Sequence, residues 1–352
     1  MRPGSLNQHS RGIFVFILAA IFLLIITLRD ISIQRSKKCL TLKVVNNPVP
    51  LSRPPDLRRH LPLIFGWAYF MLKYSCRETK YTRKKVVEYR MDAFFNEQLR
   101  VAQIAARQAG EIVLRLQGDA SVSEKALDNL VTEADIKAQE KIIKTIRNHF
   151  PEHSIMAEEQ DLSAKSGAAD LWIIDPLDGT NNFAHSIPHF CISIAYARSG
   201  RVVAGAVFDP VRQEMFSATR GRGAFLNDVP ISVSKAQTLQ EAIIATGFYY
   251  DRGEMMRQTL KSIEKLFEAN IHGIRRLGSA ALDLCWVACG RFDAYFEYNL
   301  STWDFAAGML LIEEAGGYCT DQKGSRLDLN SSGIAVSNGK FHSEFIKIIG
   351  WG

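Results

Sequence analysis

Two aspartates three residues apart, Asp175 and Asp178, follow directly on an apolar segment in the stretch WIIDPLDGTNNF. A buried carboxylate is destabilised unless it is hydrogen-bonded, paired with a cation or bound to a metal. The order Asp-Pro-x-Asp-Gly is also a favourable reverse turn. The stretch therefore predicts either a plain turn or a cation-binding loop.

Acidic residues stand at the ends of three further apolar segments: Asp135, Glu158 with Glu159, and Asp304. Taken singly, Asp135 and Asp304 would complement the N-terminus of a helix, and the glutamates would lie in a solvated loop. Taken together, acids that repeatedly end apolar segments are typical of a sheet that presents its ligands at one rim. The set favours one shared acidic site.

The DPLDGT loop offers oxygen ligands only. Asp175, Asp178 and the Leu177 carbonyl can point into one concavity, and oxygen is the ligand that Mg²⁺ prefers. The amides of Gly179 and Thr180 can face a phosphate at the start of a helix. The sequence has no Cys/His cluster for a softer metal and no GxxxxGK[ST] loop for a nucleotide triphosphate. These features predict metal-assisted hydrolysis of a phosphate ester.

A long amphipathic helix precedes these acids. Helical periodicity predicts a helix over residues 91–116. The residues expected on or near its buried face are Phe94, Leu99, Ile104, Ala105 and Ile112.

Helices and strands mix in the remainder of the chain. Glycine-containing turns join strand-like runs into an antiparallel meander, and Thr302 and Gly316–Gly317 are expected to begin and end a late helix. The predicted segments are a helix over 136–150, strands over 154–156 and 171–174, the meander over 190–210 and 214–227, and a helix over 303–315. This order predicts one compact α/β unit built of stacked layers.

The charge of the chain is unevenly distributed. Residues 1–90 carry 17 Lys and Arg against 4 Asp and Glu, whereas residues 91–352 carry 26 against 33. A mildly acidic domain has no electrostatic reason to bind nucleic acid directly. The six cysteines show no CxxC spacing, and Cys285 and Cys289 lie in an apolar stretch, which favours buried free thiols and a reducing compartment.

An apolar segment, residues 12–28, contains 17 uncharged residues and is followed by several basic ones. That length is at the lower limit for a membrane-spanning helix, and the positive charges would leave the downstream chain in the cytoplasm. A signal peptide is the alternative, although no A-x-A cleavage site follows. The change in character at Met91 favours a third interpretation: translation starts there and residues 1–90 are a gene-model artefact.

The motif DPLDGT, with an upstream EE and a downstream WDFAAG, resembles the inositol monophosphatase family of lithium-sensitive, Mg²⁺-dependent phosphatases. The resemblance runs from Met91 to the C-terminus, and RRLGSAALDLCWVACGRFDAYFE is most similar to the bacterial inositol-1-monophosphatases. It implies the layered α-β-α-β-α sandwich, an α/β (α+β) fold, that this family shares with fructose-1,6-bisphosphatases. The resemblance leaves residues 1–90 outside.

The resemblance also implies a metal site with two to three Mg²⁺ ions. Glu158, Asp175 and the Leu177 carbonyl would hold the first ion. Asp175, Asp178 and Asp304 would hold the second.

A third, weaker Mg²⁺ would lie near Glu158, with Asp135 acting largely through water. By the same resemblance, Thr180 would orient and activate the attacking water together with these two acids. The phosphate would rest on the amides of Gly179 and Thr180. The implied reaction is direct in-line transfer to water without a covalent phosphoenzyme.

Glu297 matches the family position that hydrogen-bonds inositol hydroxyls, with a solvated strand end as the structural alternative. Gly278, Ser279 and Ala280 match the segment that lines the sugar side of the pocket, with tight backbone packing before a helix as their alternative.

Departures from the family pattern are small: Ala157 replaces a frequent glycine, and Asn181 a frequent threonine. His185 and His189 follow the motif without a Ser or Cys nucleophile beside them. We expect both histidines to be loop or packing residues.

The resemblance implies a cytoplasmic phosphatase of inositol 1-phosphate and similar small phosphate esters, and it suggests a homodimer. Related enzymes act on fructose 1,6-bisphosphate, 3′-phosphoadenosine phosphates or NADP, which remain alternatives. Bacterial relatives also take part in transcription complexes with the ribosomal RNA antitermination machinery. A binding role with such a partner, or a membrane-tethered phosphatase if residues 12–28 are translated, are the competing hypotheses.

Overall fold

The computed structural model describes residues 31–36, 39–44, 81–118, 122–126, 129–159, 168–248 and 252–350, with side chains described for 95–118, 132–159, 168–248 and 252–350. Internal contacts divide the chain into two units, Met1–Thr79 and Lys80–Gly352. In the first unit the described residues form an antiparallel hairpin of β1 (Ile31–Ser36) and β2 (Cys39–Val44). The apolar segment 12–28 lies outside the described residues. Among the helices that are described, none combines the length and apolarity needed to cross a bilayer.

The second unit begins with the long helix α3 (Tyr81–Leu116). The predicted C-terminal end is correct, but the helix begins ten residues before Met91 and passes through that position without a break. Its buried face also differs from the prediction: of the predicted residues whose side chains are described, only Ala105 is fully buried. The other buried residues are mostly small or β-branched, namely Val101, Ala102, Ala106, Ala109 and Val113, together with Phe95 and Gln98. Leu99, Ile104 and Ile112 are only half-buried, and the side chain of Phe94 is outside the described set.

Close packing explains this choice of face. A Cβ atom added to Gly110 would lie 2.7 Å from Cε1 of Phe208, in the strand beneath the helix. Gly110 therefore leaves no room for a side chain, and mostly small residues occupy the buried positions around it.

A seven-stranded sheet forms the centre of the unit, in the order β11-β10-β9-β8-β7-β6-β5. Neighbouring strands run antiparallel except for the parallel pair β5 and β6, so the predicted meander is present. The strands are β5 (Ser154–Ala157), β6 (Asp170–Asp178), β7 (Cys191–Arg198), β8 (Arg201–Asp209), β9 (Glu214–Thr219), β10 (Ala224–Leu226) and β11 (Val229–Ile231).

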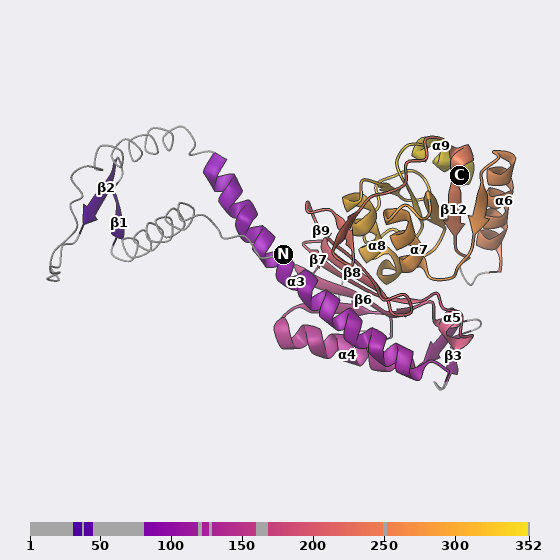
Figure 1. Cartoon of the computed structure of the whole chain (residues 1–352), viewed down its shortest axis with the longest axis horizontal. Coiled ribbons are helices and arrows are strands. Elements are labelled where there is room, and N and C mark those ends of the chain that lie inside the picture. The colour runs from indigo at the N-terminus through magenta and orange to yellow at the C-terminus, as the bar shows by residue number, and fades with distance from the viewer. Residues whose placement is uncertain are drawn as a thin grey trace, which may run out of the picture. The chain divides into compact units, whose positions relative to one another are not determined.

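Helices cover both faces of this sheet (Figure 1). On one face lie α3 and α4 (Glu133–His149), and on the other α7 (Ala280–Ala288) and α8 (Thr302–Glu314). Side chains of β6 alternate between the two cores, with Trp172 and Ile174 toward α3 and α4, and Leu171 and Ile173 toward α7 and α8. Because side chains alternate along a strand, Asp175 continues the row that faces α8.

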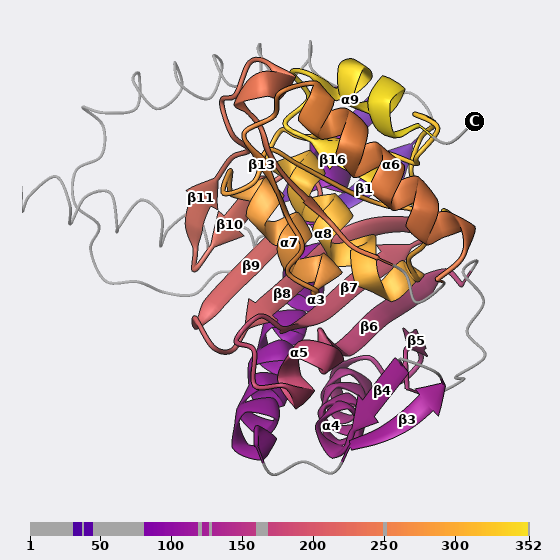
Figure 2. The same cartoon turned by 90° about the vertical axis from the view of Figure 1, so that its right-hand side faces the viewer.

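A five-stranded sheet lies beyond α7 and α8, in the order β13-β12-β14-β16-β15 (Figure 2). Its strands are β12 (Ile243–Thr246), β13 (Gly273–Arg275), β14 (Ala294–Glu297), β15 (Tyr318–Thr320) and β16 (Ile334–Ser337). A third apolar core joins this sheet to α6 (Glu254–Glu268) and α9 (His342–Ile349). The predicted α-β-α-β-α layering is confirmed.

Two helix starts differ from the predictions by a few residues. Helix α4 begins at Glu133 rather than at residue 136, so Asp135 lies inside its first turn. Helix α8 is capped by Ser301 rather than Thr302, because the backbone N–H of Ser301 donates to the Asp304 carboxylate at 2.7 Å. The predicted stop is correct, since Gly316 adopts a φ of +88° just after α8, where glycine has no steric penalty.

Candidate active site

The two aspartates of the DPLDGT loop lie on a bulge at the end of β6. Asp175 pairs with Ser193 and Asp178 with Cys191, so β6 has one more residue than β7 between these two pairs. The N–H of Leu177 donates to Asp175 Oδ1 at 3.0 Å and stabilises the turn. The tight turn and the presentation of both carboxylates at one rim are therefore two aspects of the same local structure.

Glu158 reaches the same rim from the neighbouring strand. Ala157 pairs with Ile174 in parallel register, and the N–H of Glu158 donates to the Ile174 carbonyl at 3.3 Å. Because parallel strands end at the same edge, Glu158 follows the end of β5 directly beside Asp175.

Asp135 and Asp304 occupy equivalent positions in two helices. Each is the third residue of its helix, and one carboxylate oxygen accepts the N–H of the preceding cap residue, Thr132 or Ser301. The other oxygen of Asp135 accepts the Thr180 hydroxyl at 2.9 Å, while Asp304 lines the pocket described below. The capping role and the site role, weighed as alternatives in the sequence, coexist because a carboxylate has two acceptor oxygens.

Asp178 is fastened to the first turn of α7. Its Oδ2 accepts the Ser279 hydroxyl and the Ala281 N–H, both at 2.7 Å. Burial raises the pKa of Asp178, and these two donors act in the opposite direction. The loop of the first sheet and the helix beneath the second sheet therefore meet at this carboxylate.

The acids at this rim destabilise one another when ionised. Burial raises the pKa of Asp175 well above its usual value, and the charge of Glu158 raises it further, as do the charges of Asp178 and Asp304. Burial likewise raises the pKa of Asp304, with Asp178 and Glu158 adding to it. Crowded, desolvated carboxylates of this kind become stable as anions when a cation is bound among them.

The donor set fits a hard divalent cation. It consists of carboxylate and carbonyl oxygens, and the Leu177 carbonyl accepts the Thr180 hydroxyl at 3.0 Å with one lone pair still available. Across the described ranges, no three His, Cys, Asp or Glu side chains already converge as a formed metal cluster. These residues therefore fit a divalent cation by their donor chemistry and by lining one cavity, but in the described part of the chain they do not form a complete coordination shell.

A cavity of about 330 Å³ opens over these acids and extends to β14. Of the residues predicted for the site, those that line it are Glu158, Asp175, Leu177, Asp178, Gly179, Thr180, Gly278, Ser279, Ala280, Glu297 and Asp304. Asp135 lies just behind this lining, in contact with Thr180.

Glu297 lines the cavity from the end of β14 and is 7% exposed, so the solvated-strand alternative is wrong. The Tyr295 hydroxyl donates to Glu297 Oε2 at 2.5 Å, and burial raises the pKa of Glu297 to about 7. A Cβ on Gly247 would lie 1.9 Å from the same oxygen, so only glycine leaves room for this carboxylate.

A sequence model of the inositol monophosphatase family matches residues 96–350. The chain belongs to that family. The "Nus factor SuhB" of Pseudomonas aeruginosa is 44% identical over 250 residues, which cover 69% of this chain and 92% of the relative. An inositol monophosphatase structure from Anabaena (Nostoc) is 38% identical with a TM-score of 0.65, and covers 72% of this chain and 96% of its own. A staphylococcal inositol monophosphatase-1, described as a LiCl-soaked inhibitory complex, is 28% identical with a TM-score of 0.63, covering 74% and 94%.

Two features of this inositol monophosphatase family member were missed in the sequence. Asp283 lines the cavity, and burial raises its pKa to about 6. An acid within the apolar run AALDLCWVA was a signal that could have revealed it. Asp283 contacts His189, which was predicted to be only a loop or packing residue. No local signal marks that histidine, because its partner lies 94 residues away in the chain.

Proposed function

We propose that the chain is a Mg²⁺-dependent phosphatase that hydrolyses myo-inositol 1-phosphate and similar phosphomonoesters. The observation that carries this proposal is that four carboxylates from three segments of the chain line one cavity: Glu158, Asp175, Asp178 and Asp304. Membership of the inositol monophosphatase family supports it.

Glu158, Asp175 and the Leu177 carbonyl would hold one Mg²⁺, and Asp178 and Asp304 would share a second with Asp175. A third, weaker ion would lie near Glu158. When bound, such ions neutralise charge on the phosphoryl group and on the departing alkoxide, and they lower the pKa of a bound water.

Thr180 and Asp135 form the part of the chain that orients the water. The Thr180 hydroxyl can donate its one proton to Asp135 or to the Leu177 carbonyl, at 2.9 and 3.0 Å, and its oxygen then accepts a hydrogen bond from water. Burial raises the pKa of Asp135, while hydrogen bonds from Thr132 favour its anionic form. Asp135 and Glu158 would take up the proton that the water loses.

The substrate would bind along the cavity from the loop to β14. The amides of Gly179 and Thr180 would face the phosphate, Gly278, Ser279 and Ala280 would line the sugar side, and Glu297 would accept hydrogen bonds from ring hydroxyls. Glu297 lines this cavity from β14 whereas Asp175 and Asp178 line it from β6, which supports this direction. The description of the staphylococcal relative as a LiCl inhibitory complex supports lithium sensitivity.

A protein-binding role is the second candidate, because the P. aeruginosa relative is named a Nus factor. It would place this chain in a transcription complex, as a cytoplasmic homodimer, with or without catalysis. A pull-down of transcription proteins with the wild type and with a metal-ligand variant would separate the two activities.

Phosphate release from inositol 1-phosphate by the full chain tests the first proposal. We expect turnover that requires Mg²⁺, is inhibited by lithium and is abolished in Asp304→Asn. Asp228→Asn is the matched control, since it neutralises an exposed acid in the turn between β10 and β11. Equal activity of the two variants would refute the metal-site assignment. Activity on bisphosphates alone would show that a bisphosphate, rather than inositol 1-phosphate, is the substrate.

A further inference from the structure

A buried histidine connects the two sides of the cavity. His189 lies between α5 (Thr180–Ala184) and β7 and is 5% exposed. Its Nε2 is 3.1 Å from Asp283 Oδ1 in α7, and its ring packs edge-on against Trp286 with centroids 5.2 Å apart. The segment that follows the DPLDGT loop is thereby attached to α7.

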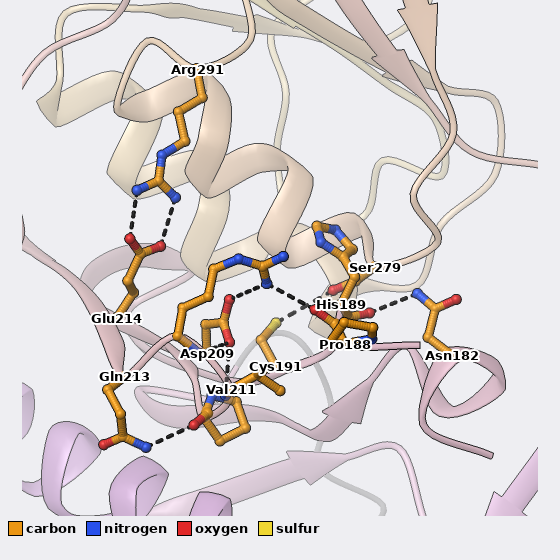
Figure 3. Close-up of polar contacts among 12 residues, drawn as sticks. Asn182, Pro188, His189, Cys191, Asp209, Val211, Gln213, Glu214, Ser279 and Arg291 are labelled. Carbon is orange, nitrogen blue, oxygen red and sulfur yellow. Dashed lines mark hydrogen bonds and ion pairs between the residues drawn. The ribbon is translucent and has the colours of Figure 1, made fainter. Parts of the chain in front are cut away.

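The backbone of His189 supports the loop itself (Figure 3). Its carbonyl accepts the Asn182 side chain at 2.6 Å, and the same Nδ2 donates to the Leu277 carbonyl at 2.8 Å. A Cβ on Gly179 would lie 3.0 Å from the His189 carbonyl oxygen, so this backbone lies directly against the glycine that begins α5. A displacement of His189 would therefore displace the Gly179 backbone.

The residue before His189 is anchored from a third direction. Asp209 is fully buried, and its Oδ1 accepts the N–H groups of Val211 and Arg212 at 2.9 Å. The Arg212 guanidinium donates to Asp209 Oδ2 at 2.8 Å and to the Pro188 carbonyl at 2.9 Å. The turn between β8 and β9 thus holds Pro188 (Figure 3). His189 joins this fixed segment to α7, alongside the Arg212 guanidinium over the Trp286 ring and Cys191 Sγ at 3.6 Å from Ser279 Oγ.

The other end of the connection is the first turn of α7, which donates to Asp178. Ser279 and Ala281 hold that carboxylate at 2.7 Å, one helical turn from Asp283. The contact between His189 and Asp283 consequently links the donors that hold the Asp178 carboxylate to the backbone that lies against Gly179.

We propose that His189 is a positioning residue of this site: through Asp283 it fixes α7 against the DPLDGT loop, so that the Asp178 carboxylate keeps its orientation relative to the Gly179–Thr180 backbone. The expected change in kcat rests on the proposed function. The expected change in Mg²⁺ affinity can be measured whether or not the protein turns over a substrate.

The full chain with His189→Phe tests this inference, because phenylalanine keeps a ring against Trp286 and removes the bond to Asp283. His189→Gln is the restoring variant, since its amide N–H can donate to Asp283. His342→Phe is the matched control: His342 is 6% exposed and bonds to Thr320 and Ser337 at 3.0 and 2.9 Å, on the far side of the second sheet. The measurements are the Mg²⁺ affinity by calorimetry, kcat and KM for inositol 1-phosphate, and Tm.

We expect His189→Phe to weaken Mg²⁺ binding and lower kcat, each by about tenfold or more, with a smaller change in KM, as for other residues that orient metal ligands. His189→Gln should recover most of the Mg²⁺ affinity and of kcat. His342→Phe should lower Tm without changing the Mg²⁺ affinity or kcat. If His189→Phe and His342→Phe lower Tm alike and neither alters Mg²⁺ affinity or kcat, His189 only packs its segment and the inference is wrong. A wild type that binds Mg²⁺ but hydrolyses no ester would refute the proposed function, and the affinity comparison would still decide the role of His189. A wild type that binds no Mg²⁺ would overturn both.

Discussion

The two ends of the cavity each contain a buried carboxylate, Asp175 and Glu297, but stabilise it differently. At the end formed by the seven-stranded sheet, the neighbours of Asp175 are other acids, and after burial their charges are what raise its pKa. At the end formed by the five-stranded sheet, burial raises the pKa of Glu297 to about 7, and a hydrogen bond from Tyr295 counteracts part of that effect. Both ends have hydrogen-bond donors, but beside Asp175 and Asp304 the neighbouring negative charges outweigh them, so this end is the one that an external cation would stabilise most when ionised.

Under the proposed function, this difference would separate catalysis from recognition within one cavity. Like charges held close together destabilise the metal-free fold and favour the binding of a divalent cation. A carboxylate with a fixed hydrogen-bond donor instead keeps its other oxygen available for a substrate hydroxyl. Substitutions at the two ends should accordingly change different properties: the dependence on Mg²⁺ at the first end and the pH dependence of stability at the second.

Asp175→Asn should have the largest effect. It removes a ligand that both main ions would share, so kcat should fall by about 10³-fold, the order of a several-kcal/mol loss of transition-state stabilisation. Because it also removes one of the crowded charges, the metal-free variant should melt at a higher temperature than the metal-free wild type. Thermal denaturation with and without Mg²⁺ measures both effects, with Asp228→Asn as the control. A variant that is less stable without Mg²⁺, yet is still stabilised by it, would contradict the comparison.

Glu297→Gln should change the pH dependence of stability. The pKa of Glu297 is about 7 in the folded state against an ordinary value of 4.5, so the folded state binds this proton more tightly than the unfolded state. The stabilisation is complete below pH 4.5 and is lost as the pH rises through 7, a decrease of about 3 kcal/mol in the free energy of unfolding. Urea denaturation in metal-free buffer at several pH values should show this decrease in the wild type and a smaller one in the variant. Parallel curves for the two proteins would show that Glu297 does not titrate in this range.

The sequence was sufficient to predict the acids of the first end. Each stands where an apolar segment stops, and in β6 the strict alternation of side chains determines which face Asp175 takes. The layered fold follows from the same segments and from the family resemblance.

Features that depend on distant contacts could not be predicted in this way. The buried face of α3 is selected by how closely the helix approaches Phe208, and periodicity alone does not contain that distance. Asp283 stands out only as an acid within an apolar run, His189 carries no local signal, and their contact exists only after α7 has packed against the first sheet. Sequence patterns therefore predicted the acids that line the cavity, but not the contact between His189 and Asp283 behind them.

Thr132→Ala should have the smallest effect, because it removes one hydroxyl group that donates to Asp135 behind the first end of the cavity. The Thr132 hydroxyl accepts the Ala134 N–H at 3.2 Å and donates to Asp135 at 2.5 Å, so its loss should lower the free energy of unfolding by about 1 kcal/mol, as for other helix caps. The backbone N–H of Thr132 still holds the same Asp135 oxygen at 2.8 Å, so kcat should fall only about threefold. Thr132→Ser keeps the hydroxyl and should restore both quantities, as measured by urea denaturation and phosphate release. If Thr132→Ala instead abolishes turnover at unchanged stability, the hydroxyl acts directly on the water that Thr180 and Asp135 orient, and Thr132 belongs to the reacting end of the cavity rather than to the scaffold of α4.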